Sequence, residues 1–198
     1  MKGVRLVEQT GLVSRMWRAT RLQPSLYEEV EADKTATNQA AAAVVIVSIA
    51  TGLGAGLRAI TSGGTFTAMW NLFIGAAASL VAWLVFALFV YLVGVNIFKG
   101  KETKSDWGEV LRTMGFANSP RFFKILAFLP VVGTAIYLIA ATWSLVATII
   151  AIRAALDFST LRAILTAISG VILYNLLIWA LTHLLGGAPL LGSWPVVR

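Results

Sequence analysis

The feature that most constrains this chain is the absence of charge over four long, mostly apolar stretches. No Asp, Glu, Lys or Arg occurs within residues 35–57, 59–98, 125–152 or 163–197. Each stretch exceeds the ~18 apolar residues that indicate a helix spanning a bilayer. Because lipid offers the backbone no hydrogen-bonding partner, a spanning segment must be a helix or part of a closed barrel. Apolar runs without the two-residue alternation of barrel strands predict helices.

The residues that most enzymes need are scarce in these stretches. The chain has no cysteine and a single histidine, His183, and its predicted spans contain no Asp or Glu. We therefore expect no catalytic residue, no metal site and no cofactor, and a protein that is not an enzyme. The net charge of +7 comes from basic residues that flank the apolar stretches. This placement favours anionic membrane lipids as partners and excludes nucleic acid.

The breaks between apolar stretches predict an all-α, polytopic membrane protein with five transmembrane helices. We expect the spans at about residues 40–60, 70–98, 120–133, 134–156 and 160–185. The third is short because Pro130 and Gly133 interrupt it, so we expect an oblique helix. Its break at Pro130 should be buried against neighbouring spans, since lipid cannot satisfy an interrupted backbone.

The distribution of positive charge predicts the orientation. Fourteen of the 16 Lys and Arg residues lie in residues 1–39, 99–124 and 153–162, and only Arg58 and Arg198 lie elsewhere. Because cytoplasmic loops carry the excess of Lys and Arg, we expect a cytoplasmic N-terminus and an external C-terminus in the cell (inner) membrane. The domain prediction is a cytosolic segment at 1–39, a membrane domain at 40–185 and a short external tail at 186–198.

The segment 10–23 has the pattern of an amphipathic helix lying on the membrane surface. One face carries four apolar residues and the opposite face three arginines: Leu12, Val13, Met16 and Trp17 against Arg15, Arg18 and Arg21. We expect the arginines to contact anionic lipid or a partner. The alternative is a helix packed on the protein's own cytosolic face.

Two further helices are expected outside the spans. Pro24 ends the first amphipathic helix, and a capping box of Ser25 with Glu28 should open an acidic helix. With no breaker before Gly52, this helix could continue from Leu26 into the first span. A second interfacial helix is predicted from Asp106, capped with Glu109, to about residue 115.

Four residues within or beside the spans are candidates for contacts with lipids or other helices. Arg121 and Lys124 lie near the predicted cytosolic end of the third span, where they could bind lipid phosphate or an acidic partner, or simply extend to the headgroups. Gly52 and Gly56 form a GxxxG pattern in the first span. This pattern predicts close helix packing.

The segment from Leu111 to Pro120, with the sequence LRTMGFANSP, resembles the Gly-aromatic-Ala-x-x-Pro opening of the third span in Yip domain proteins. That family is named for members that interact with Ypt/Rab GTPases. The resemblance covers roughly residues 20–185 and implies a cytosolic N-terminus and five clustered spans. Eukaryotic members carry Asp-Leu-Tyr-Gly-Pro where this chain has Leu26-Tyr27-Glu28-Glu29, so the resemblance does not extend to Rab-type GTPase binding. The overall style is similar to prokaryotic members.

These observations together predict a non-enzymatic, multi-pass membrane protein. We expect it to act in membrane organisation, or as an accessory subunit that packs with itself or with other membrane proteins. The alternative is a small permease or channel, which would require a file of polar residues facing one cavity. Uncharged spans argue against ion coupling in such a transporter.

Overall fold

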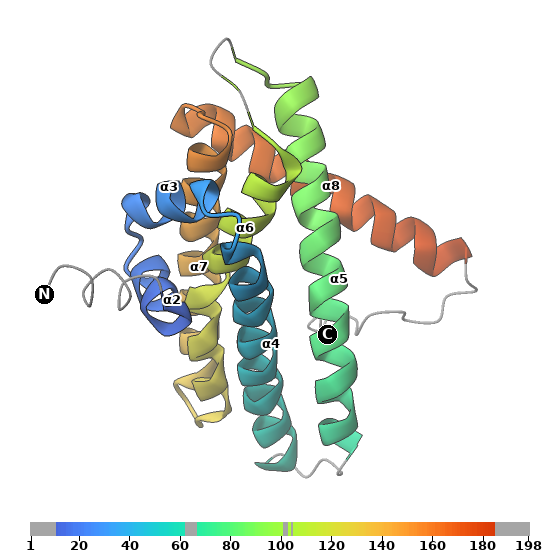
Figure 1. The fold of residues 1–198 in the computed structure, drawn as a ribbon. Coiled ribbons are helices and arrows are strands. Elements are labelled where there is room, and N and C mark those ends of the chain that lie inside the picture. Colours follow the sequence, from blue (N-terminus) through green and yellow to red (C-terminus); the bar gives the residue numbers. More distant parts are fainter. Residues whose placement is uncertain (1–10, 62–66, 101–102, 104, 185–198) are drawn as a thin grey trace, which may run out of the picture.

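The computed structural model describes residues 11–61, 67–100, 103 and 105–184, and all regular structure within these ranges is helical (Figure 1). The elements in chain order are α2 (Leu12–Thr20), α3 (Pro24–Ala32), α4 (Ala36–Thr61), α5 (Thr67–Asn96), α6 (Trp107–Ala117), the 3-10 helix η1 (Ser119–Phe128), α7 (Gly133–Ala155) and α8 (Thr160–Leu184). The predicted external tail at 186–198 lies outside the described residues.

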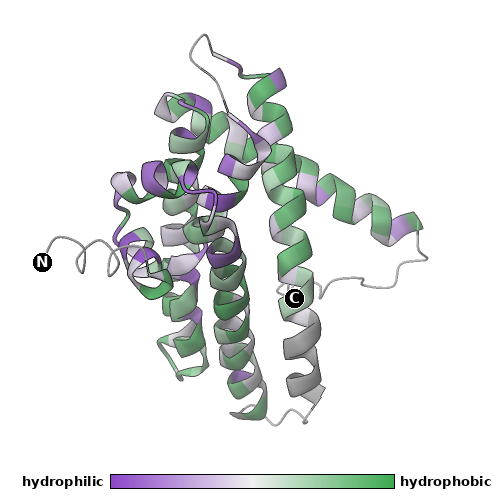
Figure 2. Cartoon of the chain, in the orientation of Figure 1, coloured by the Kyte–Doolittle hydropathy of each residue, from purple (hydrophilic) through white to green (hydrophobic). Residues whose placement is uncertain are grey.

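Four of the described helices are long and apolar enough to cross a membrane. Their apolar segments have mean hydropathies of 2.1 to 2.4 and are Ala36–Arg58, Gly75–Asn96, Gly133–Ala155 and Thr160–Leu184. They correspond to the first, second, fourth and fifth predicted spans. Between 17% and 33% of each apolar window is buried within the protein, so most of these side chains face outward. Figure 2 shows hydrophobic colours along these helices and hydrophilic colours concentrated on α2, α3 and the start of α4.

The third predicted span has a different structure from the one expected. It forms η1, a ten-residue 3-10 helix, and is not one of the four helices that are long and apolar enough to cross a membrane. Together, α6 and η1 run alongside α4 from its start to its end. Gly115 on α6 packs against Ala40 near the start of α4. Ala127 on η1 has its carbonyl oxygen 3.5 Å from the guanidinium of Arg58, near the end of α4. A 3-10 helix rises ~2.0 Å per residue against 1.5 Å in an α-helix, which explains how so short a segment reaches so far.

The break after η1 is exposed, and the expectation that it would be buried is wrong. η1 ends at Phe128 and α7 begins at Gly133, which confirms an interruption around Pro130. Pro130 is exposed, and Val131 is 100% exposed with a positive φ of 67°. The backbone needs no neighbouring span here, because the turn itself supplies a bond of 2.9 Å from the Gly133 N–H to the carbonyl of Leu129.

The acidic helix does not continue into the first span. Helix α3 ends at Ala32 and α4 begins at Ala36, because the Asp33 carboxylate accepts bonds from the backbone N–H and the hydroxyl of Thr35, at 2.9 and 2.6 Å. An Asp side chain that binds the backbone two residues later competes with helix continuation.

The two predicted capping boxes have opposite outcomes. Helix α3 starts at Pro24, with Gln23 as the cap residue and no side-chain cap bond, so the predicted box of Ser25 and Glu28 is wrong. The box at Asp106 and Glu109 that opens α6 is confirmed.

Helix α6 lies inside the protein and not on its surface, as Figure 1 shows. All eight residues from Val110 to Ala117 are buried, whereas one apolar face alone was expected. The helix contacts α3, α4, α5 and α7, and the indole N–H of Trp83 on α5 donates to the carbonyl of Leu111 at 3.2 Å. Helix α6 therefore lies between the N-terminal helix α3 and the long apolar helices α4, α5 and α7, and contacts all of them.

Candidate functional site

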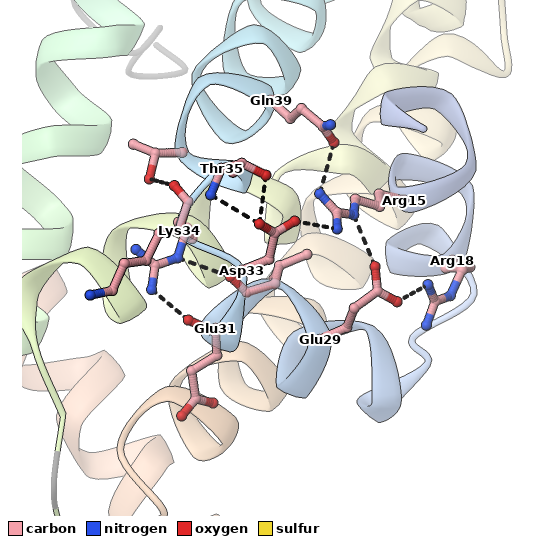
Figure 3. Close-up of polar contacts among 11 residues, drawn as sticks. Arg15, Arg18, Glu29, Glu31, Asp33, Lys34, Thr35 and Gln39 are labelled. Atoms are coloured by element: carbon pink, nitrogen blue, oxygen red, sulfur yellow. Dashed lines mark hydrogen bonds and ion pairs between the residues drawn. The ribbon is translucent and has the colours of Figure 1, made fainter. Parts of the chain in front are cut away.

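The polar residues of the N-terminal helices converge on one buried guanidinium. Arg15 on α2 is 1% exposed, and its three nitrogens donate to Glu29 at 3.0 Å, to Asp33 at 2.7 Å and to Gln39 at 3.0 Å (Figure 3). Glu29 belongs to α3, Asp33 follows α3, and Gln39 lies on α4. One side chain therefore fixes three helices relative to one another through charge-assisted hydrogen bonds.

A second arginine completes this cluster. Arg18 donates to the other carboxylate oxygen of Glu29 and, at 3.3 Å, to the side chain of Gln23. We call the set Arg15, Arg18, Glu29, Asp33 and Gln39 the α2 clasp. Hydrogen bonds from Thr35 and then from Arg15 hold the pKa of the Asp33 carboxyl below its usual value, so Asp33 is ionised at neutral pH.

The clasp changes the expected orientation of α2. In the structure α2 packs against the rest of the protein, which agrees with the alternative given for this helix in the sequence analysis. Arg15 and Arg18 pair with acidic groups of the same chain, whereas Arg21 is exposed and lies with its guanidinium carbon 5.0 Å from the Trp17 ring centroid. The apolar residues Val13 and Trp17 face outward, with 78% and 52% of their surfaces exposed.

A second group of charges lies on the other side of α3, and the Glu31 side chain in Figure 3 points away from the clasp. Glu31 and Asp157 line a cleft of about 840 Å³ between α3 and the end of α7, together with Pro24, Glu28, Ile150, Arg153, Ala154 and Phe158. Partial burial, followed by the negative charges of Glu109, Asp157 and Glu28, raises the pKa of Glu31 to about 7.

Arg112 was expected only as one of the basic residues that mark the cytosolic side. It is 5% exposed, and its guanidinium donates to the backbone carbonyl of Val30 at 2.9 Å and also to that of Glu31. These carbonyls belong to the last turn of α3, where carbonyl groups have no hydrogen-bond donor within the helix. The sequence separation of about 80 residues gave no local signal of this contact.

The two basic residues of η1 have different environments. Arg121 is exposed, whereas Lys124 is 5% exposed with its Nζ atom 3.9 Å from the ring centroid of Tyr137 on α7. Among the residues that the structure describes, neither side chain forms a hydrogen bond or an ion pair. Lys124 lies beside the last third of α4 and not near its start, because its backbone carbonyl abuts Gly54. It is therefore far from the start of α4, the end of the first span that the sequence analysis assigned to the cytosol.

The backbone of α4 approaches η1 closely at Gly54, between the two predicted glycines. A Cβ atom at Gly54 would lie 2.9 Å from the Cα of Ile125 and closer still to the carbonyl of Lys124. Gly52 and Gly56 are each two residues away, about 200° around the helix, so they lie on the opposite face. Both are half-buried. Their role in helix packing stays a prediction.

Comparison with known proteins identifies a family. The family model of the Yip1 domain matches residues 23–185, which include every element from α3 to α8. No curated protein and no solved structure matches the chain significantly. The family match covers most of the sequence, and the four apolar helices have the length that a bilayer requires. The chain is a multi-pass membrane protein and belongs to the Yip1 domain family.

Proposed function

We propose that this protein is a non-enzymatic membrane-organising protein that acts through α2 and α3 at the cytosolic face of the cell (inner) membrane. In this proposal α2 inserts its outward apolar edge into the cytosolic leaflet while the clasp holds it to the bundle. The proposal extends to contacts with other membrane proteins or with a second copy, for which the face of α4 carrying Gly52 and Gly56 is the candidate surface.

One observation carries the proposal: α2 is held by the clasp yet leaves Val13 and Trp17 uncovered. Arg15 bonds to Gln39, in the first turn of α4, which places α2 beside the start of that apolar helix. Val13 and Trp17 face away from the protein at this level. A Trp at the boundary between hydrocarbon and headgroups is a typical interfacial contact, and the nearby Arg21 suits anionic lipid. Leaflet insertion of such a helix is sensitive to membrane curvature.

The proposal includes five crossings, with α6 and η1 together forming the third. Support comes from the path of α6 and η1, which begins beside Ala40 at the start of α4 and reaches Arg58 near the end of α4. Support also comes from the distribution of Lys and Arg, which favours a cytoplasmic N-terminus and an external C-terminus.

The depth of α2 is the first test. Because the chain has no cysteine, a single Cys at Val13 or at Ser25 can carry a spin label in the reconstituted full-length protein. Ser25 is the matched control, since it is exposed and lies on α3. We expect the label at position 13 to collide more often with oxygen than with a water-soluble nickel complex, and the label at position 25 to show the reverse. A label at position 13 in water would contradict the proposal.

The effect on membranes is the second test. In vesicles of mixed diameter made with anionic lipid, we expect the wild-type protein to be denser in the smaller vesicles. The double variant Val13→Asp/Trp17→Asp should lose this preference while keeping the clasp. An equal distribution of the wild-type protein would contradict a role in membrane organisation. The permease alternative gains no support from the apolar crevice beside η1, whose six lining residues are all apolar.

A further inference from the structure

The most unusual group in the membrane helices is the Lys124 ammonium. The Lys124 residue as a whole is 5% exposed, and no carboxylate of the described residues pairs with its ammonium. Ionisable groups at such positions are costly and usually have a partner. The Tyr137 ring, 3.9 Å from Nζ, contributes attraction through its face but carries no charge. A cation in this place therefore calls for an anion from outside the chain.

The 3-10 geometry of η1 brings a second cation to the same side. Residues three apart eclipse each other in a 3-10 helix, so Arg121 and Lys124 lie on one face, ~6 Å apart along the axis. Two neighbouring positive charges repel unless an anion lies between them. Arg121 is exposed whereas Lys124 is buried, so the pair leads from the lipid-facing surface into the protein.

The contact region of η1 and α7 also contains an apolar crevice. It has a volume of about 230 Å³ and lies between η1 and α7, lined by Phe123, Leu126, Ile136, Ile139, Ala140 and Trp143. Phe123, the residue before Lys124, stacks on Trp143 with ring centroids 5.9 Å apart. Two of its lining residues, Phe123 and Ile136, directly precede Lys124 and Tyr137 in the chain. Paired cations beside an apolar crevice match a ligand with an anionic head and a hydrocarbon chain.

We propose that η1 and α7 form a binding site for one anionic phospholipid, with its phosphate between Arg121 and Lys124 and part of an acyl chain in the crevice. The site rests on the proposed function only in placing η1 within the membrane. The headgroup of a zwitterionic lipid would bring a further positive charge next to the two cations, so charge complementarity favours an anionic headgroup.

The test measures phospholipid bound to the full-length protein. Protein purified in mild detergent is mixed with equal phosphatidylglycerol and phosphatidylcholine, and native mass spectrometry counts the retained lipid. We expect one phosphatidylglycerol on the wild type. The double variant Arg121→Gln/Lys124→Met should lower this retention by roughly tenfold or more. The control Lys99→Gln removes one charge from an exposed position at the end of α5 and should retain the lipid.

A second variant tests the crevice without changing charge. Ile139 is 61% exposed, so Ile139→Trp can fill the crevice from its open side with little effect on the core. We expect it to reduce retention while the unfolding temperature stays close to that of the wild type. This variant also decides the question if the double variant does not fold.

Several results would overturn the site. Equal retention of both lipids, or equal loss in Lys99→Gln, would mean that the two cations do not select the lipid. Displacement by millimolar inorganic phosphate, with no effect of Ile139→Trp, would indicate a small-anion site and no lipid site. Failure here is distinguishable from failure of the proposed function, because the depth of a label at position 13 reports on α2 alone.

Discussion

Arg15 shows how a single residue can take a role opposite to the one its helix pattern suggests. On a helical wheel it belongs to the basic face of α2, yet it is the largest fully buried side chain among the described residues. Its partners Glu29 and Asp33 keep about 30% and 28% of their side-chain surfaces exposed. The clasp is thus a partly solvated ion-pair network with one buried centre.

Removing the Arg15 charge should destabilise the N-terminal helices. Arg15→Met removes one donor from each of two carboxylates and from an amide, and we expect a loss of ~1–3 kcal/mol, less than for a fully buried pair because the carboxylates reach water. The control Arg21→Met, on the exposed side of the same helix, should change stability by less than ~0.5 kcal/mol. Denaturant unfolding in mild detergent, followed by tryptophan fluorescence, measures both. Similar values for the two variants would mean that the clasp adds no stability.

Glu31 should make stability depend on pH near neutrality. Its pKa of about 7 in the folded protein lies above the usual value of 4.5, so the folded state binds its proton more tightly than the unfolded state. The sign follows directly: as pH rises from about 4.5 to about 7, this residue contributes progressively less stability.

Glu31→Gln removes this dependence because the amide resembles the protonated acid. We expect the variant to unfold at a higher temperature than the wild type at pH 8 and at a similar temperature at pH 5. Thermal unfolding of the two proteins across this range provides the comparison, and Glu28→Gln, which removes one of the charges that raise the Glu31 pKa, should weaken the pH dependence without abolishing it. A wild-type advantage at pH 8 would contradict the assigned repulsion from Glu109 and Asp157.

At the scale of elements, the 3-10 helix η1 packs along α4. The two helices approach closely at Gly54, where the backbone of η1 occupies the space of a side chain. Such a contact satisfies the close packing that small residues allow in membrane helices. It also fixes the height of Lys124 along α4.

A methyl group at Gly54 should weaken this contact. The atoms that it would meet are backbone atoms of Lys124 and Ile125, which cannot move aside cheaply, so Gly54→Ala should cost ~1–3 kcal/mol. At Gly75 on α5 nothing lies within 4 Å, and Gly75→Ala should be neutral or stabilising by ~0.5–1 kcal/mol through helix propensity. Unfolding in a graded detergent series compares them. A tolerated Gly54→Ala would show that η1 can shift away from α4.

At the scale of the whole molecule, the direction of η1 determines on which side the chain ends. The carbonyl of Ala127 lies near the Arg58 end of α4, and a Cβ at Gly94 would meet the side chain of Leu156 near the other end of the bundle. Helix α7 therefore runs from the Arg58 end of α4 back to the end at which α5 finishes. If α6 and η1 together cross the hydrocarbon, the chain crosses the membrane five times and its two ends lie on opposite sides.

Labelling at the tip of η1 tests this topology in intact cells. Val131 is fully exposed in the turn, so a cysteine there can react with a membrane-impermeant maleimide. We expect Val131→Cys to be labelled from outside and Ser105→Cys, before α6, to be labelled only after the membrane is opened. Protection of position 131 in intact cells would leave four crossings and a cytoplasmic C-terminus.

The sequence by itself determined the features that depend on solvent and on neighbours along the chain. Charge-free length was enough to locate α4, α5, α7 and α8, because a bilayer imposes the same hydrogen-bonding demand on every spanning segment. The capping box of Asp106 and Glu109 was equally readable, since both of its bonds lie within four residues.

Only the tertiary structure decided which charges meet and how tightly helices approach. Arg15 bonds to residues 14 to 24 positions away, and Arg112 to carbonyls about 80 positions away. The amphipathic pattern of α2 was correct, yet it did not show which part of the helix surface packs inward. Likewise, the interruption at Pro130 was visible, but the 3-10 form of η1 was not. The physical reason is the same in each case: a local pattern fixes a helix and its faces, whereas the identity of the neighbour that covers each face depends on the packing of distant segments.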